Sequence, residues 1–268
     1  MEVGKVLKIT NLQKTFNAGT VNAKTALNGL DLEIRDGEFV TVIGGNGAGK
    51  STLLNAIAGV WKPDYGTIEI DGVDVTRMPE YKRAKFLGRV FQDPMKGTAP
   101  DMEIAENLAI ASKRGEKRRF VRGVRRADRE RYRQLLSTLE LGLEDRLSTK
   151  VGLLSGGQRQ AITLLMATMN RPRLLLLDEH TAALDPKTAA KVLELTDQIV
   201  QKNHLTTLMI THNMRDAIAH GNRLIMMHEG QIIIDVSGKE KKNLTVEQLL
   251  SLFTQASGGI VNDRMVLS

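Results

Sequence analysis

A glycine-rich segment at residues 44–51, called here the phosphate loop, has the residue types and spacing to bind phosphate. It reads GGNGAGKS, which matches G-x-x-x-x-G-K-[ST], and it follows a predicted strand and opens a predicted helix. The glycines let backbone N–H groups curl around a phosphate, and the helix N-terminus adds a favourable dipole and free donors. Lys50 supplies a positive charge, and the Ser51 hydroxyl can ligate Mg²⁺. The predicted nucleotide-binding residues here are Gly44, Gly45, Asn46, Gly47, Ala48, Gly49, Lys50, Ser51 and Thr52.

Two acids end the apolar run LLLLDE, and the first of them follows Lys50 by 128 residues. A carboxylate at the carboxyl edge of a parallel sheet lies where ligands bind in open α/β sheets. Asp178 is therefore suited to hold Mg²⁺, and Glu179 is a candidate general base for a water that attacks the γ-phosphate. The alternative for Glu179 is an ordinary surface acid at a strand end. Together with the phosphate loop, the pair predicts a P-loop nucleotide-binding protein with a hydrolytic site.

A second candidate anion site lies in the sequence LSGGQ at residues 154–158, called here the signature segment. Ser155 can cap the helix that follows, and Gly156 and Gly157 expose its first N–H groups. A single γ-phosphate does not need two such sites from one chain about 100 residues apart.

The order of motifs along nearly the whole chain resembles the ATP-binding cassette (ABC) family. After the phosphate loop come a Gln in FQDP, the signature segment, LLLLDE, AALD and a His that closes a strand in ITHN. In that family two copies form a head-to-tail dimer, and the signature of one copy covers the ATP held by the other. The resemblance thus implies ATP and Mg²⁺ as cofactors, and it assigns Ser155, Gly156, Gly157 and Gln158 to the partner's ATP.

Further roles are implied residue by residue. Gln92 matches the glutamine that senses Mg²⁺ and the attacking water, so the implied metal set is Ser51, Gln92 and Asp178, and the implied catalytic set is Glu179, His212 and Gln92. His212 matches the switch histidine, which contacts the γ-phosphate; the alternative is a strand-end histidine with a structural role. Asp185 matches an aspartate that reaches across the dimer and also fits a helix N-cap before Pro186. Phe16 stands where the family has an adenine-stacking aromatic, and simple packing is its alternative.

The chain departs from the family pattern after Glu179. The family usually has Pro-Thr or Pro-Ser there, whereas this chain has His180-Thr181 in an otherwise aligned DEHTAALDP. His180 either tunes proton traffic beside Glu179 or packs locally, and packing is the commoner outcome. With a histidine at this position, the sequence resembles a subgroup of ABC import ATPases for amino acids or related small nutrients.

The elements that must position these residues alternate between strands and helices, which predicts an α/β fold. The sequence favours a P-loop NTPase core of RecA-like type, with an N-terminal antiparallel β subdomain and an inserted helical subdomain. Continuous apolar runs at 38–44, 173–179 and 206–212 predict strands buried on both faces. We predict one ABC ATPase domain over 1–268, with the core at about 1–93 and 159–240, the helical subdomain at about 94–158 and a short tail at 241–268. Further predicted elements are strands at 6–10, 26–34 and 67–72, a helix at about 50–59, a hairpin at 223–236 and a short amphipathic helix in TVEQLLSLF.

Composition excludes several classes of protein. The chain lacks cysteine, which excludes disulfides and thiolate metal sites, and it lacks any run of 18 apolar residues that could span a membrane. The net charge of +7 comes from residues 113–133, called here the basic segment, which holds eleven Lys or Arg and three acids. The segment fits a solvated helix face or contact with anionic lipid or a partner protein; nucleic acid is disfavoured because base-stacking aromatics are scarce. We predict that Arg118, Arg119, Arg122, Arg125 and Arg126 strengthen docking to the membrane or to a membrane partner.

These features predict an ATP-hydrolysing subunit that powers an ABC transporter at the cytoplasmic face of the cell membrane, with nutrient import as the preferred direction. The expected partners are a separate transmembrane permease, a second copy of the chain and an extracytoplasmic solute-binding protein, and no nucleic acid. One alternative is the ATPase subunit of an exporter. Another is a soluble ABC ATPase that acts on ribosomes or DNA, but this chain has one cassette and no long coiled coil. A nucleotide-binding regulator that does not hydrolyse ATP is disfavoured by Glu179, Gln92 and His212.

Overall fold

The computed structural model describes residues 4–116 and 123–256. Arg118, Arg119 and Arg122 of the basic segment and residues 257–268 of the tail therefore lie outside the described residues. The strands are β1 Lys5–Phe16, β2 Lys24–Arg35, β3 Phe39–Gly44, β4 Tyr65–Ile70, β5 Val73–Asp74, β6 Leu87–Val90, β7 Leu174–Asp178, β8 Thr207–Ile210, β9 Arg223–His228 and β10 Gln231–Ser237. The helices are α1 Lys50–Ala58, α2 Glu80–Arg83, α3 Ile104–Ser112, α4 Arg126–Ser137, α5 Gly156–Thr168, α6 Pro186–Asn203, α7 Met214–Ala219, α8 Gly238–Lys242 and α9 Val246–Ala256, with short 3₁₀ turns η1 Pro94–Gly97 and η2 Val151–Leu153.

The strands form two sheets, and the larger one is a mostly parallel sheet in the order β10-β9-β3-β8-β7-β6. The predicted buried strands β3, β7 and β8 lie inside it, and β7 is buried on both faces. Leu174 and Leu176 pack on the side of α1, whereas Leu175 and Leu177 pack on the side of α5. The α/β prediction is confirmed, because crossover helices cover both faces of a parallel sheet.

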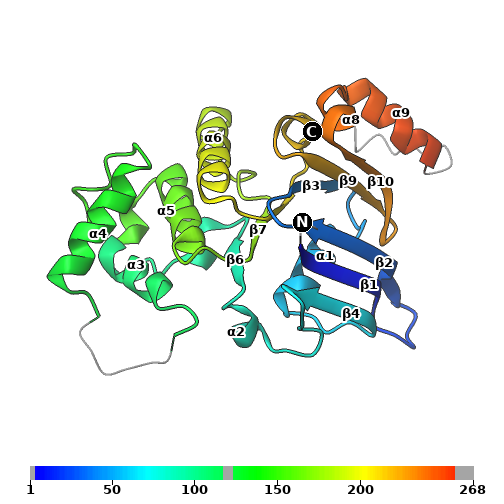
Figure 1. Cartoon of the computed structure of the whole chain (residues 1–268), viewed down its shortest axis with the longest axis horizontal. Helices are drawn as coiled ribbons and strands as arrows, with labels where there is room; N and C mark the ends of the chain where they lie inside the picture. The colour runs from blue at the N-terminus through cyan, green and yellow to red at the C-terminus, as the bar shows by residue number, and fades with distance from the viewer. Residues whose placement is uncertain (1–3, 117–122, 257–268) are drawn as a thin grey trace.

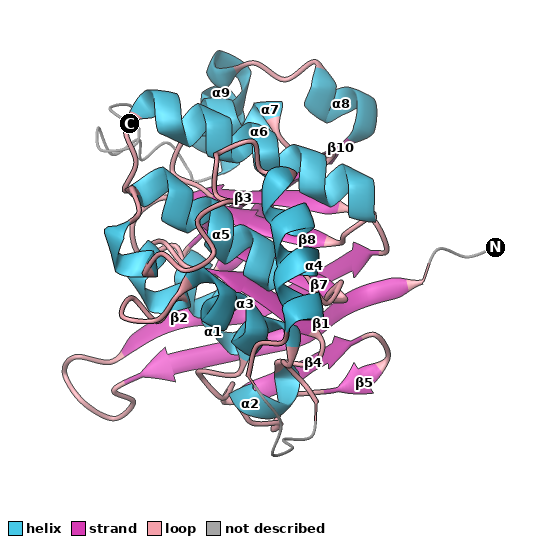
Figure 2. Ribbon diagram, turned by 90° about the vertical axis from the view of Figure 1, so that its left-hand side faces the viewer, coloured by secondary structure: helices cyan, strands magenta, loops and turns pink. Residues whose placement is uncertain are grey.

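The smaller sheet is antiparallel, in the order β2-β1-β4-β5, and it is built from the first third of the chain (Figure 2). Its first strand is longer than the predicted 6–10. Register shifts near Asn11, which has a φ of 46°, let β1 continue through polar residues to Phe16 while it pairs with β2. These irregularities break the alternation of apolar and polar residues, so the sequence pattern showed only half of the strand.

The middle of the chain is helical, as predicted, and its helices gather to one side of the strands (Figure 1). α3, α4 and α5 share an apolar cluster with β6, β7 and α6. α4 contributes few buried residues, Tyr132 and Leu136, because most of its sequence is charged. The basic residues Arg125 and Arg126 lie at the start of this helix.

The chain after β10 returns to the larger sheet. The predicted helix in TVEQLLSLF is confirmed as α9, whose Leu249 and Phe253 pack against β9 and β10. The predicted hairpin is confirmed too, since β9 and β10 pair antiparallel across a turn at Glu229-Gly230. Among residues 4–116 and 123–256, every helix is too short or too polar to cross a bilayer.

Candidate functional site: a nucleotide cradle at the carboxyl edge of the parallel sheet

The phosphate loop leaves the central strand β3 and enters α1, as predicted. Gly49 precedes the helix with a φ of 101°, and a side chain there would run into the Ala26 carbonyl oxygen of β2. Gly44 has a φ of 151°, and a side chain there would run into the Met227 carbonyl oxygen of β9. Both positions therefore need glycine, because L side chains rarely adopt these angles and the neighbouring backbone leaves no room. The tight loop keeps the free N–H groups at the start of α1 together, which suits a phosphate.

The side chain of Lys50 is buried against the phosphate loop, and the loop together with this side chain is called here the Lys50 cradle. Its side-chain ammonium donates hydrogen bonds to the carbonyl oxygens of Gly44 at 2.7 Å and Gly45 at 3.2 Å, and only 5% of the residue is exposed. Burial lowers the pKa of Lys50, and the nearby carboxylate of Glu179 partly offsets that effect. A desolvated cation fixed on the loop is suited to interact strongly with a phosphate.

Glu179 and His212 meet at the ends of adjacent strands. β7 and β8 are parallel, and Asp178 pairs in register with Ile210 at their carboxyl ends. The His212 Nε2 lies 2.6 Å from the Glu179 Oε2, and Glu179 is 9% exposed. Glu179 has a φ of 47°, which is unusual for a non-glycine residue and re-aims the chain directly after the strand. The structure thus brings together the acid and the histidine that the sequence placed 33 residues apart.

Asp178 ends β7 and remains partly exposed, with 18% of its side chain accessible. Ser51 follows Lys50 in the first turn of α1, and its residue is exposed. Gln92 is exposed just after β6, the edge strand that pairs with β7. These three residues carry the hydroxyl, carboxylate and amide oxygens that Mg²⁺ prefers.

The signature segment caps α5, as predicted. The Ser155 hydroxyl accepts a hydrogen bond from the Gln158 backbone N–H at 3.3 Å, and the Gln158 side chain accepts one from the Ser155 N–H at 3.3 Å. This reciprocal capping box fixes the first turn of the helix. α5 packs against α3, α6, β6 and η1, whereas α1 packs against β2, β3 and β7. The two candidate anion sites therefore lie on different parts of the molecule.

Two further predicted residues occupy definite places. Asp185 caps α6 by accepting a hydrogen bond from the Thr188 N–H at 3.1 Å, and hydrogen bonding to Thr188 lowers the pKa of Asp185. The predicted N-cap is therefore confirmed. Phe16 ends β1 and packs edge-to-face on Trp61, with ring centroids 5.3 Å apart. Both the stacking and the packing interpretations of Phe16 fit this partly exposed pair.

The chain is similar in sequence to proteins of one known family. A family model described as ABC transporter matches residues 27–182, which is more than half of the chain. The chain belongs to the ABC transporter family. A tyrosine transport ATP-binding protein from Clostridioides difficile strain R20291 is 47% identical over 251 residues, covering 94% of this chain and 100% of the relative. A xylose/arabinose import ATP-binding protein from Sulfolobus acidocaldarius is 34% identical, covering 96% of this chain and 97% of the relative.

Solved ABC cassettes share the fold. A dimeric cassette in a post-hydrolysis state, bound to ADP and Pi, superposes with a TM-score of 0.73 at 30% identity and covers 86% of this chain and 98% of its own. The protein is thus an ATPase that uses ATP with Mg²⁺. The cradle fits this ligand, because buried Lys50 and the glycines that no Cβ could replace favour a polyphosphate. Bound Mg²⁺ would neutralise phosphate charge and polarise the transferred group.

His180 packs locally, which supports one of the two alternatives drawn from the sequence. The residue is 2% exposed, and its Nε2 lies 3.1 Å from the Thr196 hydroxyl oxygen on α6. Because that hydroxyl donates to the Val192 carbonyl at 2.8 Å, the His180 Nε2–H is the donor to Thr196. Burial lowers the pKa of His180 to about 4, and the electrostatic interaction with His220 acts in the same direction. His180 is therefore neutral at pH 7 and connects the segment after β7 to α6.

We expect His180 to make stability depend on pH in acid. The unfolded chain protonates this imidazole near pH 6.5, whereas the folded chain resists protonation until about pH 4. The neutral residue thus contributes its full stabilisation above pH 6.5. As the pH falls to about 4, we expect the free energy of unfolding to decrease by about 3 kcal/mol on account of His180. Urea unfolding of the wild type and of His180→Gln, whose amide does not titrate, measures this between about pH 7 and about pH 4. Equal pH slopes for the two proteins would contradict it.

The sequence did not reveal three residues that the structure joins to the site. Arg89 on β6 contacts Asp178 and Asn55, and Gln160 on α5 donates a hydrogen bond to the Phe91 carbonyl at 3.2 Å, directly before Gln92. Gln160 ends the polar first part of α5, GGQRQ, so the sequence carries no signal that its side chain is buried and fully inside the fold.

Proposed function

We propose that this chain is the ATPase subunit of an importer for an amino acid or related small nutrient. The observation that carries the proposal is the pair Glu179–His212 beside the Lys50 cradle, because it supplies a base and a phosphate site in one place. The solute class is supported by the tyrosine transport relative, which the chain covers over its full length. The DEHTAALDP sequence around His180 agrees with an amino-acid import subgroup.

In this proposal Glu179 accepts a proton from the water that attacks the γ-phosphate, and His212 and Gln92 orient that water. The loop residues Gly44–Thr52 and Phe16 bind one ATP, and Ser51, Gln92 and Asp178 hold Mg²⁺. Ser155, Gly156, Gly157, Gln158 and Asp185 complete the ATP site of a second copy. The capped N-terminus of α5 supports this arrangement, since its first N–H groups are available to an anion outside the chain.

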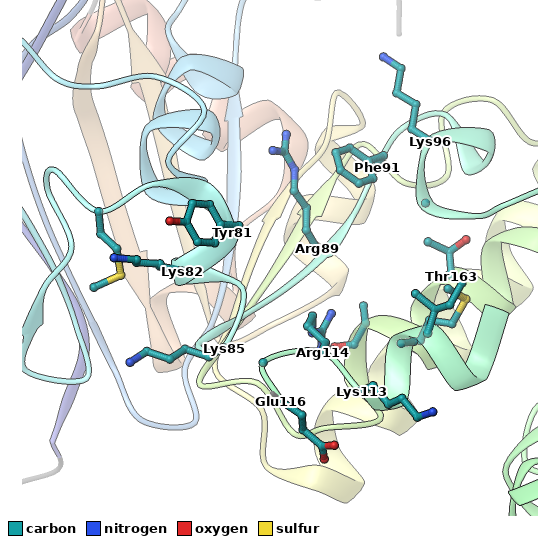
Figure 3. A pocket seen from close by; sticks show the side chains of 17 residues that line it. Tyr81, Lys82, Lys85, Arg89, Phe91, Lys96, Lys113, Arg114, Glu116 and Thr163 are labelled. Carbon is teal, nitrogen blue, oxygen red and sulfur yellow. Dashed lines mark hydrogen bonds between the residues drawn. The ribbon is translucent and has the colours of Figure 1, made fainter. Parts of the chain in front are cut away.

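A groove between α2 and α5 supports a separate permease as partner. It has a volume of about 960 Å³ and lies where α2, β6, η1 and the end of α3 approach α5 (Figure 3). Its charged lining is Lys82, Lys85, Arg89, Lys96, Lys113, Arg114 and Glu116. Six cations against one acid favour a cytoplasmic segment of the permease that carries acidic side chains. The docked subunit then lies at the cytoplasmic face of the membrane, and a solute-binding protein delivers solute on the other side.

The same groove supports the proposed boundary at about residue 93, whereas the other proposed boundary, at 158/159, falls inside α5, which packs against α3 and η1. β6 and α2 on one wall belong to the proposed core of about 1–93 and 159–240, whereas α3 and η1 belong to the proposed helical subdomain of about 94–158. Arg125 and Arg126 lie at the start of α4 in that proposed subdomain.

Reconstitution tests the proposal. The chain and a candidate permease are placed in liposomes with ATP trapped inside, and labelled tyrosine and other amino acids are offered outside with a candidate solute-binding protein. Because an importer carries solute toward the side that holds its ATPase, we expect label to accumulate inside. Glu179→Gln is the inactive control. In a parallel sample the label is loaded inside together with the ATP; ATP-dependent release of that label to the outside, without uptake in the first sample, indicates an exporter and would overturn import.

The permease assignment has its own measurement. The double variant Lys82→Glu, Lys85→Glu reverses charge in the groove, and we expect it to lose retention on permease-containing membranes while keeping basal ATPase activity. The matched control reverses two exposed lysines on α8, Lys239 and Lys242. Equal retention of both variants contradicts docking in the groove.

A further inference from the structure

Arg89 is a cation held inside the molecule at an unusual place. It lies on β6, the edge strand of the larger sheet, and 14% of its side chain is exposed. Its guanidinium carbon lies 4.5 Å from the centre of the Phe91 ring, and both side chains face the groove (Figure 3). Of the described residues that line the groove, Arg89 is the one whose side chain makes a polar contact with Asp178.

The contacts of Arg89 join two elements of the ATP site. One nitrogen, Nη2, donates to the Asn55 Oδ1 on α1 at 2.7 Å and lies 3.4 Å from the Asp178 Oδ2 at the end of β7. The register explains the reach, because Arg89 pairs with Leu176 and Asp178 lies two residues further on the same face of β7. α1 begins with Lys50 and Ser51, so Arg89 links the helix that carries the Ser51 hydroxyl to the strand that carries Asp178.

Packing alone does not require an arginine at position 89. Arg89 Nε is buried without a hydrogen-bond partner, which is an unfavourable arrangement for a cation. An apolar side chain of similar length would fill the space against Phe91 without that penalty. Phe91 is also fixed from the other side, because its carbonyl accepts a hydrogen bond from Gln160. A charge kept in such surroundings indicates a role beside Asp178.

We propose that Arg89 is a positioning residue for the ATPase reaction. It holds the Asp178 carboxylate at a fixed place relative to α1, so that Ser51 and Asp178 keep the separation that a divalent cation needs. Its contacts are with Asp178, Asn55 and Phe91, and it has no role in holding the nucleotide. Partners that orient a metal-binding carboxylate generally raise metal affinity by about 10-fold to 100-fold. If Arg89 acted only by repelling the metal cation, its removal would strengthen metal binding. The direction of the change in metal affinity therefore separates positioning of Asp178 from simple repulsion.

Metal binding tests the proposal directly. Mn²⁺ is titrated into the protein with a non-hydrolysable ATP analogue, and free Mn²⁺ is followed by electron paramagnetic resonance. We expect Arg89→Met to raise the Kd for Mn²⁺ about 10-fold or more. Analogue binding without metal is expected to stay unchanged. Arg89→Lys is expected to fall between the two proteins, since one ammonium cannot reproduce the planar guanidinium contacts.

The matched control is Arg114→Met. Arg114 lines the same groove, but its hydrogen bond goes to the Ala167 carbonyl at 2.8 Å and not to Asp178. Its Mn²⁺ affinity is expected to stay at the wild-type value. If Arg89→Met fails to fold, Asn55→Ala replaces it, because it removes the acceptor that anchors Arg89 and is expected to weaken Mn²⁺ in the same direction. An unchanged or lower Kd for Mn²⁺ in the folded variant overturns the proposal.

Discussion

Glu179→Gln is expected to abolish ATP turnover and to leave ATP binding intact. The amide keeps the shape of the carboxylate but cannot accept a proton, and loss of a general base typically costs about 10² to 10⁴ in rate. The carboxylate lies 2.6 Å from His212 and next to the Lys50 cradle, so the substitution removes the proposed base and leaves the cradle itself unchanged. Steady-state phosphate release and binding of a fluorescent ATP analogue measure the two effects.

The control for this variant is Glu229→Gln. Glu229 is an exposed acid with the same φ of 47°, so it matches the backbone conformation of Glu179 without its place in the site. Its ATPase rate is expected to equal that of the wild type. Turnover of ATP by Glu179→Gln at the wild-type rate would show that another group removes the proton.

The second large effect concerns the signature segment. Ser155→Arg is expected to keep nucleotide binding and to lose ATPase activity, because in a head-to-tail dimer Ser155 acts on the ATP of the partner. The N-cap hydroxyl and the exposed first turn of α5 are replaced by a long cation that obstructs the approach of the partner's phosphates. Ser251→Arg on α9 is the matched control, since it adds the same charge at an exposed serine far along the chain.

Mixing two inactive variants sharpens this test. Lys50→Ala is expected to lose nucleotide affinity, because the buried ammonium of the cradle is gone. A heterodimer with Ser155→Arg holds one site with intact Lys50 and intact Ser155, so the mixture is expected to recover activity at one site per dimer. Absence of any recovery, with both variants folded, argues against composite sites.

The sequence predicted the parts of the site whose chemistry is local. Gly49 and Lys50 belong to one short motif, and Ser155 caps the helix that directly follows it, so each could be inferred from neighbours along the chain. β7 could be predicted because it is buried on both faces and therefore reads as a continuous apolar run.

The sequence could not predict contacts that depend on strand order. Arg89 reaches Asp178 across 89 positions because β6 is placed beside β7, and periodicity does not reveal that neighbour. The local role of His180 is a similar case, since its partner Thr196 lies on α6, 16 residues further along the chain, and only the packing of α6 brings the two side chains together. The full length of β1 was missed for another reason, because its bulges interrupt the alternation that marks a strand.

The most direct test of the account is the mass and nucleotide content of Glu179→Gln with MgATP. Light scattering behind a sizing column gives the mass, and analysis of the peak gives the ATP bound per chain. We predict a dimer with two ATP when MgATP is present and a monomer when it is absent, since the signature segment of each copy closes over the ATP of the other. A variant that binds ATP and remains monomeric would contradict the composite site.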